Sequence, residues 1–122
     1  MLAGSGSFPV LEELDLYGNN IRGPGARLLS RSATLRGLRI LSLQNNPLGI
    51  PGAKHLAKSD AFPALIELNL QGCTIKDKGA LALAAASGFP ALRRLNISHN
   101  RISSPTQAVL QAAHEGVKIQ WE

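Results

Sequence analysis

The chain has 122 residues, enough for one domain with its own core, and contains no apolar run near the ~20 residues that a membrane-spanning helix needs. Its 13 Lys and Arg exceed its 8 Asp and Glu, but this excess is spread along the chain, which favours a solvated surface over a nucleic-acid-binding one. Its single cysteine excludes an internal disulfide framework, and with no secretory signal at the N-terminus we expect a cytoplasmic location.

Residues 1–7 are small and polar, and we expect them to form a flexible leader. From residue 8 onward, one pattern of the form L-x-x-L-x-L-x-x-[NC]-x-[IL] occurs four times at a constant spacing, with its first leucine at Leu11, Leu38, Leu65 and Leu92. In the third copy the later positions, and those of the Gly-Ala pair and leucine that follow, are Leu68, Leu70, Cys73, Ile75, Gly79, Ala80 and Leu83. A constant period of this kind is the sequence signature of a repeat protein.

Alternating apolar and polar residues predict a short strand in each copy, because every second side chain of a strand faces the same side. The expected strands cover about residues 13–16, 40–43, 67–70 and 94–97, and the alternation at 117–121 predicts a fifth. Leu14 and Leu16 would face the core in the first strand. Trp121 would cover the end of that core.

A short helix is expected after each of the first four strands. The helices should cover about residues 23–32, 51–58, 78–86 and 104–114. In the first we expect Leu28 and Leu29 to face inward. Asp77 is positioned to cap the start of the third helix, and Gly88 lies just beyond its predicted end.

A unit of one strand, one turn and one short helix cannot bury its apolar face alone, so neighbouring units must stack. We therefore predict a single α/β domain over residues 8–122. It would be a right-handed solenoid with parallel strands on its concave face and short helices on its convex face.

This pattern resembles the leucine-rich repeat family over residues 8–121, and more narrowly its ribonuclease-inhibitor-like subfamily. The strand motif and the Gly-Ala-x-x-Leu of the first three helices, as at Gly79 to Leu83, carry the resemblance. The family implies recognition of a protein partner on the concave face and its rims, without a cofactor.

The outward strand positions are the candidate partner-binding residues. They are acidic in the first copy, rich in amides in the middle and basic at the end, where Lys118 and Gln120 continue them. Tyr17 and Ile40 are apolar anchors among them. The set comprises Glu13, Asp15, Tyr17, Ile40, Ser42, Gln44, Glu67, Asn69, Gln71, Arg94, Asn96 and Ser98.

A second column, here called the ladder column, consists of Asn19, Asn46, Cys73 and Asn100. We interpret it as structural, because inward amides at a strand end can hydrogen-bond the turning backbone. Cys73 has no basic neighbour in sequence that would lower its pKa and make it reactive. Three histidines, His55, His99 and His114, show no metal-ligand spacing, so we expect no catalytic, metal or cofactor site.

These observations favour a non-catalytic protein-binding module with no small-molecule substrate, no nucleic-acid ligand and no membrane anchor. One alternative is a regulator of a small GTPase resembling the Ran GTPase-activating proteins, which rests on the repeat resemblance alone. The other is a structural repeat that assembles weakly head to tail, because the acidic first copy could meet the basic last one.

Overall fold

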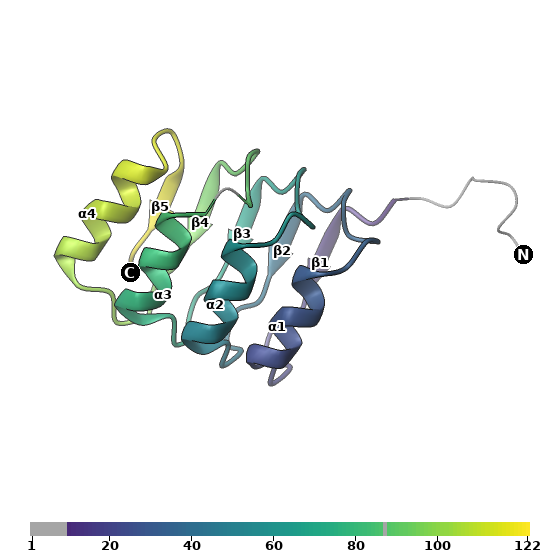
Figure 1. The fold of residues 1–122 in the computed structure, drawn as a ribbon, viewed down its shortest axis with the longest axis horizontal. Coiled ribbons are helices and arrows are strands. Elements are labelled where there is room, and N and C mark those ends of the chain that lie inside the picture. The colour runs from purple at the N-terminus through teal and green to yellow at the C-terminus, as the bar shows by residue number, and fades with distance from the viewer. Residues whose placement is uncertain (1–9, 87) are drawn as a thin grey trace, which may run out of the picture.

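The computed structural model describes residues 10–86 and 88–122, and it shows a solenoid in which strands and helices alternate (Figure 1). The predicted leader lies outside the described residues. The elements are β1 (Glu13–Asp15), α1 (Gly23–Ser30), β2 (Ile40–Ser42), α2 (Gly49–Ala57), β3 (Glu67–Asn69), α3 (Lys76–Ala84), β4 (Arg94–Asn96), α4 (Ser104–Ala113) and β5 (Lys118–Gln120). Strands and helices therefore occur where the repeat predicts them.

The five strands form one parallel sheet in the order β1-β2-β3-β4-β5. Their register follows the spacing of the sequence repeat, so that Leu14 pairs with Leu41, Leu41 with Leu68 and Leu68 with Leu95. Equivalent positions of successive repeats therefore stand side by side across the sheet.

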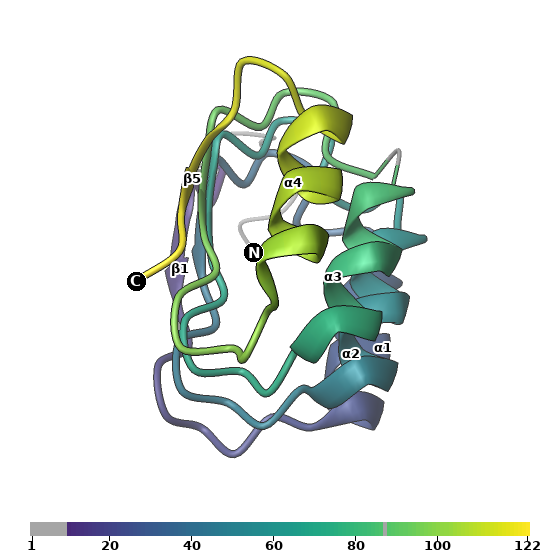
Figure 2. The same ribbon diagram turned by 90° about the vertical axis from the view of Figure 1, so that its left-hand side faces the viewer.

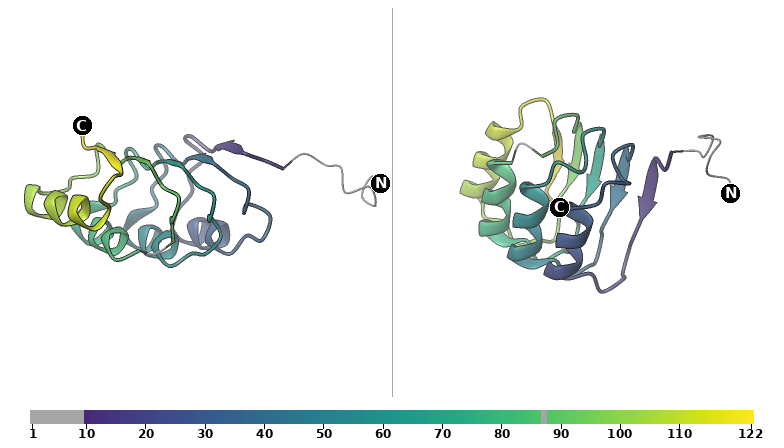
Figure 3. Two further views of the ribbon diagram at one scale, coloured as in Figure 1. Left: turned by 90° about the horizontal axis from the view of Figure 1, so that it is seen from above. Right: turned by 45° about the vertical axis from the view of Figure 1, so that its right-hand side comes forward.

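The sheet and the helices form two separate layers, which are seen edge-on in Figure 2 and from above in Figure 3. Neighbouring strands are ~4.8 Å apart, whereas packed helices need ~8–10 Å. The sheet layer is therefore the shorter of the two, and the array bends around it. The chain is a right-handed α/β solenoid with its strands on the concave face, as predicted.

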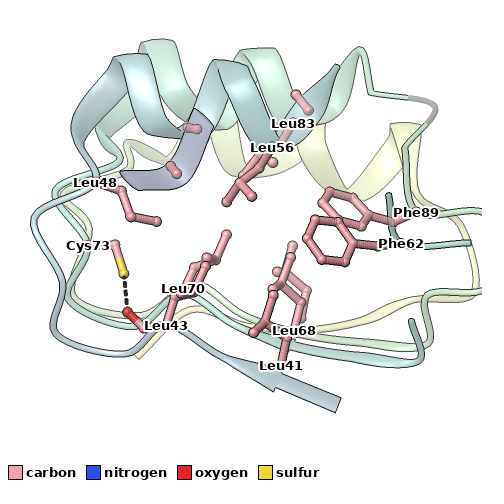
Figure 4. Close-up of a cluster of buried hydrophobic side chains, with 14 of the residues drawn as sticks. Leu41, Leu43, Leu48, Leu56, Phe62, Leu68, Leu70, Cys73, Leu83 and Phe89 are labelled. Atoms are coloured by element: carbon pink, nitrogen blue, oxygen red, sulfur yellow. Dashed lines mark hydrogen bonds between the residues drawn. The ribbon is translucent and has the colours of Figure 1, made fainter. Parts of the chain in front are cut away.

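The core fills the space between the two layers (Figure 4). Strand leucines point into it from one side and helix residues such as Leu56 and Leu83 from the other. Phe62 and Phe89 stack beyond the C-terminal ends of α2 and α3, with ring centroids 6.2 Å apart. Trp121 is half-buried against this core, which confirms its predicted position.

Two details of the helices differ from the prediction. Leu28 is 75% exposed, and the apolar residues of α1 that pack against the core are Ala26 and Leu29, because a helix of 8 residues turns a single narrow face toward the sheet. Asp77 does not cap α3, whose N-cap residue is Ile75. Its carboxylate instead accepts hydrogen bonds from the backbone N–H and hydroxyl of Ser103, at 2.7 and 2.9 Å, across to α4.

Gly88 also has a different role from the predicted helix stop, because α3 already ends at Ala84. A Cβ atom at this position would lie 2.5 Å from the carbonyl oxygen of Ser59, in the chain that follows α2. The glycine is needed for the close approach of two backbones.

None of the helices within residues 10–86 and 88–122 combines the length and the apolar character needed to cross a membrane.

Candidate functional site

The outward side chains of the sheet form one continuous surface, which we call the concave strip. Because the strands are parallel and in register, equivalent outward positions of successive strands fall in one row. The row through Glu13 continues with Ile40, Glu67, Arg94 and Lys118. The strip consists of the twelve predicted partner-binding residues together with Lys118 and Gln120.

Charge is distributed unevenly along the concave strip. Glu13 and Asp15 are exposed at β1, whereas Arg94 and Lys118 are exposed at β4 and β5. Between them, Arg94 Nη1 lies 2.6 Å from Glu67 Oε1, in the ion pair found among the described residues. That contact offsets the charges of Glu67 and Arg94 against each other, so the strip has an acidic end at β1 and a basic residue, Lys118, at β5.

The amides in the middle of the strip are bonded to one another. Asn69 Nδ2 donates to Gln44 Oε1 at 3.2 Å, and one repeat later Asn96 Nδ2 donates to Gln71 Oε1, also at 3.2 Å. Asn69 Oδ1 in turn accepts the backbone N–H of Gln71 at 3.0 Å. These bonds hold the amides in fixed positions before any partner binds, which lowers the entropy that binding would cost.

A hollow of about 830 Å³ opens over β2 to β5. Among its lining residues, the outward strand positions carry one apolar side chain, amides, a hydroxyl and charges of both signs: Ile40, Ser42, Glu67, Asn69, Arg94, Asn96, Lys118 and Gln120. The lining also includes five apolar residues and one glutamine: Leu41, Leu68, Leu95, Val117, Ile119 and Gln111. The hollow is an open surface feature and has room for side chains of a partner.

One of the predicted site residues, Ser98, is buried. Ser98 follows the outward alternation, but it is 1% exposed and its hydroxyl donates to Asn96 Oδ1 at 2.7 Å. The prediction that Ser98 is directly accessible to a partner is therefore wrong. The prediction also overlooked Asn45, whose Nδ2 donates to the hydroxyl of the anchor Tyr17 at 3.1 Å. Its position one residue before the ladder column is the signal that could have found it.

Asn46, Cys73 and Asn100 have the inward, structural role predicted for the ladder column. Asn19 does not turn inward: it is exposed, and its Nδ2 donates to Tyr17 O at 3.2 Å. Asn100 Oδ1 accepts the N–H groups of Cys73 and Ile75 at 2.9 and 3.0 Å, and its Nδ2 donates to Leu70 O at 2.7 Å. Asn46 does the same for Asn19 and Ile21 of the first repeat, at 2.8 and 2.9 Å. Each of these two asparagines therefore holds the turn of the repeat before its own.

Cys73 is the sulfur member of this column. Its thiol donates to Leu43 O at 3.1 Å (Figure 4), and burial raises the pKa of the thiol to about 11. At neutral pH the group is protonated, and thiols react as thiolates. The contacts assign it a packing role in place of an asparagine.

The histidines do not come together. His114 Nε2 lies 2.8 Å from Leu83 O in the last turn of α3, whereas His99 is in a left-handed turn with φ 57° and His55 is on α2. Within the described part of the chain, no group of three His, Cys, Asp or Glu residues is arranged to hold a metal ion.

Comparison with known proteins identifies the repeats. One Leucine Rich repeat family model matches residues 9–30 and 64–84, and a second matches residues 91–111. These ranges are the first, third and fourth copies of the pattern, and together they cover slightly more than half of the chain. The comparison with curated proteins gave no match.

Proposed function

The chain belongs to the leucine-rich repeat family, and on that basis we propose that it is a non-catalytic module that binds a protein partner through the concave strip. The observation that supports this most is the strip itself: outward side chains of β2 to β5, fixed in register, line one open hollow. Its mixture of an apolar anchor, amides and both charges is typical of a protein interface.

The chemistry of the remaining side chains also supports a binding role. The buried thiol of Cys73 is protonated, and the histidines are held apart in a turn, on a helix and at a helix end. A nucleophile needs a base within hydrogen-bond distance, and Cys73 bonds to backbone carbonyl groups instead.

We also propose that the chain belongs to the ribonuclease-inhibitor-like subfamily. A regular α-helix of 8 to 10 residues in each of the four repeats supports this, together with the Gly-Ala pair packed at the start of α2 and α3. Regulation of a small GTPase stays a prediction from the resemblance. The cytoplasmic location stays a prediction from the single cysteine and the N-terminal sequence.

The test is affinity capture from lysate with two matched variants beside the wild type. Tyr17→Ala with Arg94→Glu alters the concave strip, removing an exposed ring and reversing one charge. Leu28→Ala with Lys54→Glu makes the same kinds of change on the convex helices, where Leu28 is 75% exposed. Circular dichroism should be unchanged in both variants, since all four side chains are on the surface.

We expect the strip variant to lose the partners that the wild type and the convex variant retain. Because exposed aromatic and arginine side chains dominate many interfaces, the affinity should fall at least about tenfold. If the strip variant keeps its partners, or if the convex variant alone loses them, the concave strip is not the binding surface.

A further inference from the structure

One row of residues lies immediately before the first four strands, and its chemistry changes from repeat to repeat. It consists of Glu12, Arg39, Ile66 and Arg93, spaced at the constant period of the repeat. An acid, an apolar residue and two arginines occupy equivalent positions, so the stacking of the repeats does not require an arginine there. The repeat pattern therefore does not explain the two arginines.

Arg39 and Arg93 lie on either side of Ile66. The backbone N–H of Ile66 donates to Arg39 O, and that of Arg93 donates to Ile66 O, both at 2.8 Å. The three residues are therefore successive neighbours across the sheet, and the two arginine backbones are two strand spacings apart, about 10 Å. A long side chain on each side can reach the space beside Ile66, where both guanidinium groups can hold one anion.

A hollow of about 390 Å³ opens at this place, and we call it the arginine notch. It shares no lining residue with the hollow over β2 to β5. Besides the two arginines, its lining consists of five apolar residues: Ala64, Ile66, Pro90, Ala91 and Leu92. The notch thus places two positive charges beside an apolar surface.

In the part of the chain that the structure describes, no acid pairs with either arginine of the notch. The ion pair found there joins Arg94 to Glu67, and neither residue lines the notch. Glu12 lies next to Arg39 in the row but is also outside the lining. All 8 Asp and Glu of the sequence are described residues, so residues 1–9 and 87 have no carboxylate side chain to offer. Both arginines are exposed and carry a permanent charge.

A group with two negative charges matches this site best. The planar fork of an arginine forms paired hydrogen bonds with phosphate oxygens. A phosphate monoester carries about two negative charges at neutral pH and balances two arginines, whereas a carboxylate carries one. The apolar lining favours a phosphate that is attached to a ring, because a ring buries apolar surface there and the short side chain of phosphoserine does not.

We propose that the arginine notch binds a phosphorylated tyrosine side chain of a protein partner, with the phosphate between Arg39 and Arg93 and the ring on the apolar lining. The three row residues of the notch directly precede Ile40, Glu67 and Arg94 of the concave strip. A partner that lies on the strip can therefore reach the notch with one side chain. That this partner carries the phosphotyrosine rests on the function proposed above, whereas binding of the phosphorylated side chain itself does not.

Nuclear magnetic resonance titration with N-acetyl-phosphotyrosine amide tests the notch without any concave-strip partner. At about pH 7.5, where the phosphate is doubly charged, the backbone amides of Arg39, Ile66 and Arg93 should shift and saturate. We expect a Kd on the order of 1 mM. Arg39→Gln and Arg93→Gln should each weaken binding about tenfold, since each removes one charged fork. Arg27→Gln removes an exposed arginine from α1 instead and should bind like the wild type.

Three related probes separate the contributions of charge, ring and source. N-acetyl-sulfotyrosine amide has the same ring and one negative charge, so it should bind about tenfold more weakly. N-acetyl-phosphoserine amide keeps the phosphate without the ring and should bind about fivefold more weakly. Adenosine monophosphate, whose ring is separated from its phosphate by a polar sugar, should also bind about fivefold more weakly.

The proposal is overturned if no saturating shift occurs at the notch up to about 20 mM probe, or if either notch variant binds like the wild type. Equal binding of the sulfate ester would exclude a site for two negative charges. Equal binding of phosphoserine would exclude the ring, and tighter binding of adenosine monophosphate would assign the notch to a nucleotide. Capture from lysate with the strip variants is measured separately, so a failure of the notch and a failure of the concave strip are distinguishable.

Discussion

The first repeat and the second repeat follow the same sequence pattern but differ in how completely they are buried. Leu41 and Leu43 of β2 are 0% exposed, whereas Leu14 and Leu16 of β1 occupy the same positions and remain partly open. The second repeat is covered by a described repeat on each side, and the first on one side only. In a stacked array the neighbour supplies the burial, so identical positions contribute different amounts of stability. This is the central claim, and equivalent substitutions in the two repeats can test it.

The largest effect is expected for strand leucines. Leu41→Ala removes a fully buried side chain between two repeats and should lower the free energy of unfolding by about 3 kcal/mol. Leu14→Ala removes a partly exposed one and should lower it by about 1 kcal/mol. Urea denaturation of the two variants measures the difference directly. Equal losses of unfolding free energy in the two variants would contradict the claim that the two positions contribute differently to stability.

The ladder column gives the next contrast. Asn100→Ala leaves the buried N–H groups of Cys73 and Ile75 without their acceptor, and should lower the free energy of unfolding by about 2–3 kcal/mol. Asn19→Ala removes an exposed amide that bonds only within its own repeat, so the loss should be below about 0.5 kcal/mol. The midpoints of urea denaturation of the two variants compare these two losses. A loss for Asn19→Ala as large as that for Asn100→Ala would mean that the first repeat has an unseen neighbour in solution.

Two glycines in left-handed turns sharpen the comparison further. Gly18 has φ 64° and Gly72 has φ 65°, so an alanine is strained to the same degree at either site. An added Cβ at Gly72 would meet Asn45 Oδ1 of the preceding repeat, whereas one at Gly18 has nothing within 4 Å. We expect Gly18→Ala to cost about 1 kcal/mol and Gly72→Ala about 2 kcal/mol, since Asn45 must move as well. Thermal unfolding should place the two variants in that order, and the reverse order would contradict the packing described here.

The smallest effect concerns the contact between α3 and the start of α4. Hydrogen bonds from the backbone N–H and hydroxyl of Ser103 lower the pKa of Asp77 below its ordinary value. The unfolded chain therefore binds this proton more readily, and the contribution of Asp77 to stability is present at neutral pH and lost as the pH falls below about 4. Asp77→Asn should be less stable than the wild type at pH 7, with the gap narrowing at pH 3. Asp60→Asn, which removes an exposed carboxylate from another loop, is the control. A gap that is unchanged by acid would mean that the contact does not depend on charge.

The repeat pattern predicted most of this fold because equivalent residues recur at a constant spacing. The constant spacing of the copies fixes which residues become register partners, and the alternation within each copy fixes which side of the sheet they face. The strands, their order and the concave strip follow from those two facts. The predicted and observed strand ends differ by about one residue, a difference that is common at the ends of short elements. Backbone hydrogen bonds between repeats continue past the observed ends, as from Leu16 N–H to Ser42 O.

The errors occurred where one repeat contacts another through a side chain specific to that repeat. Asp77 has the residue type and position of a cap, but Ser103 of the next repeat competes for its carboxylate. Ser98 points outward by alternation, yet it is small and Asn96 covers its hydroxyl. The apolar character of Leu28 favours an inward position, although His55, at the equivalent position of the next repeat, indicates a more polar environment. Such contacts depend on three-dimensional neighbours that a pattern within one repeat does not contain.

Amide hydrogen exchange in dilute solution tests the central claim most directly. Three equivalent backbone bonds join successive strands: the N–H groups of Leu16, Leu43 and Leu70 donate to the next repeat at 2.9, 2.9 and 2.7 Å. Their geometry is nearly the same, so a difference in protection would report how the surrounding repeats are covered. We predict that the amide of Leu16 exchanges at least about tenfold faster than those of Leu43 and Leu70, because its repeat is covered on one side only. Equal protection at all three would contradict the account.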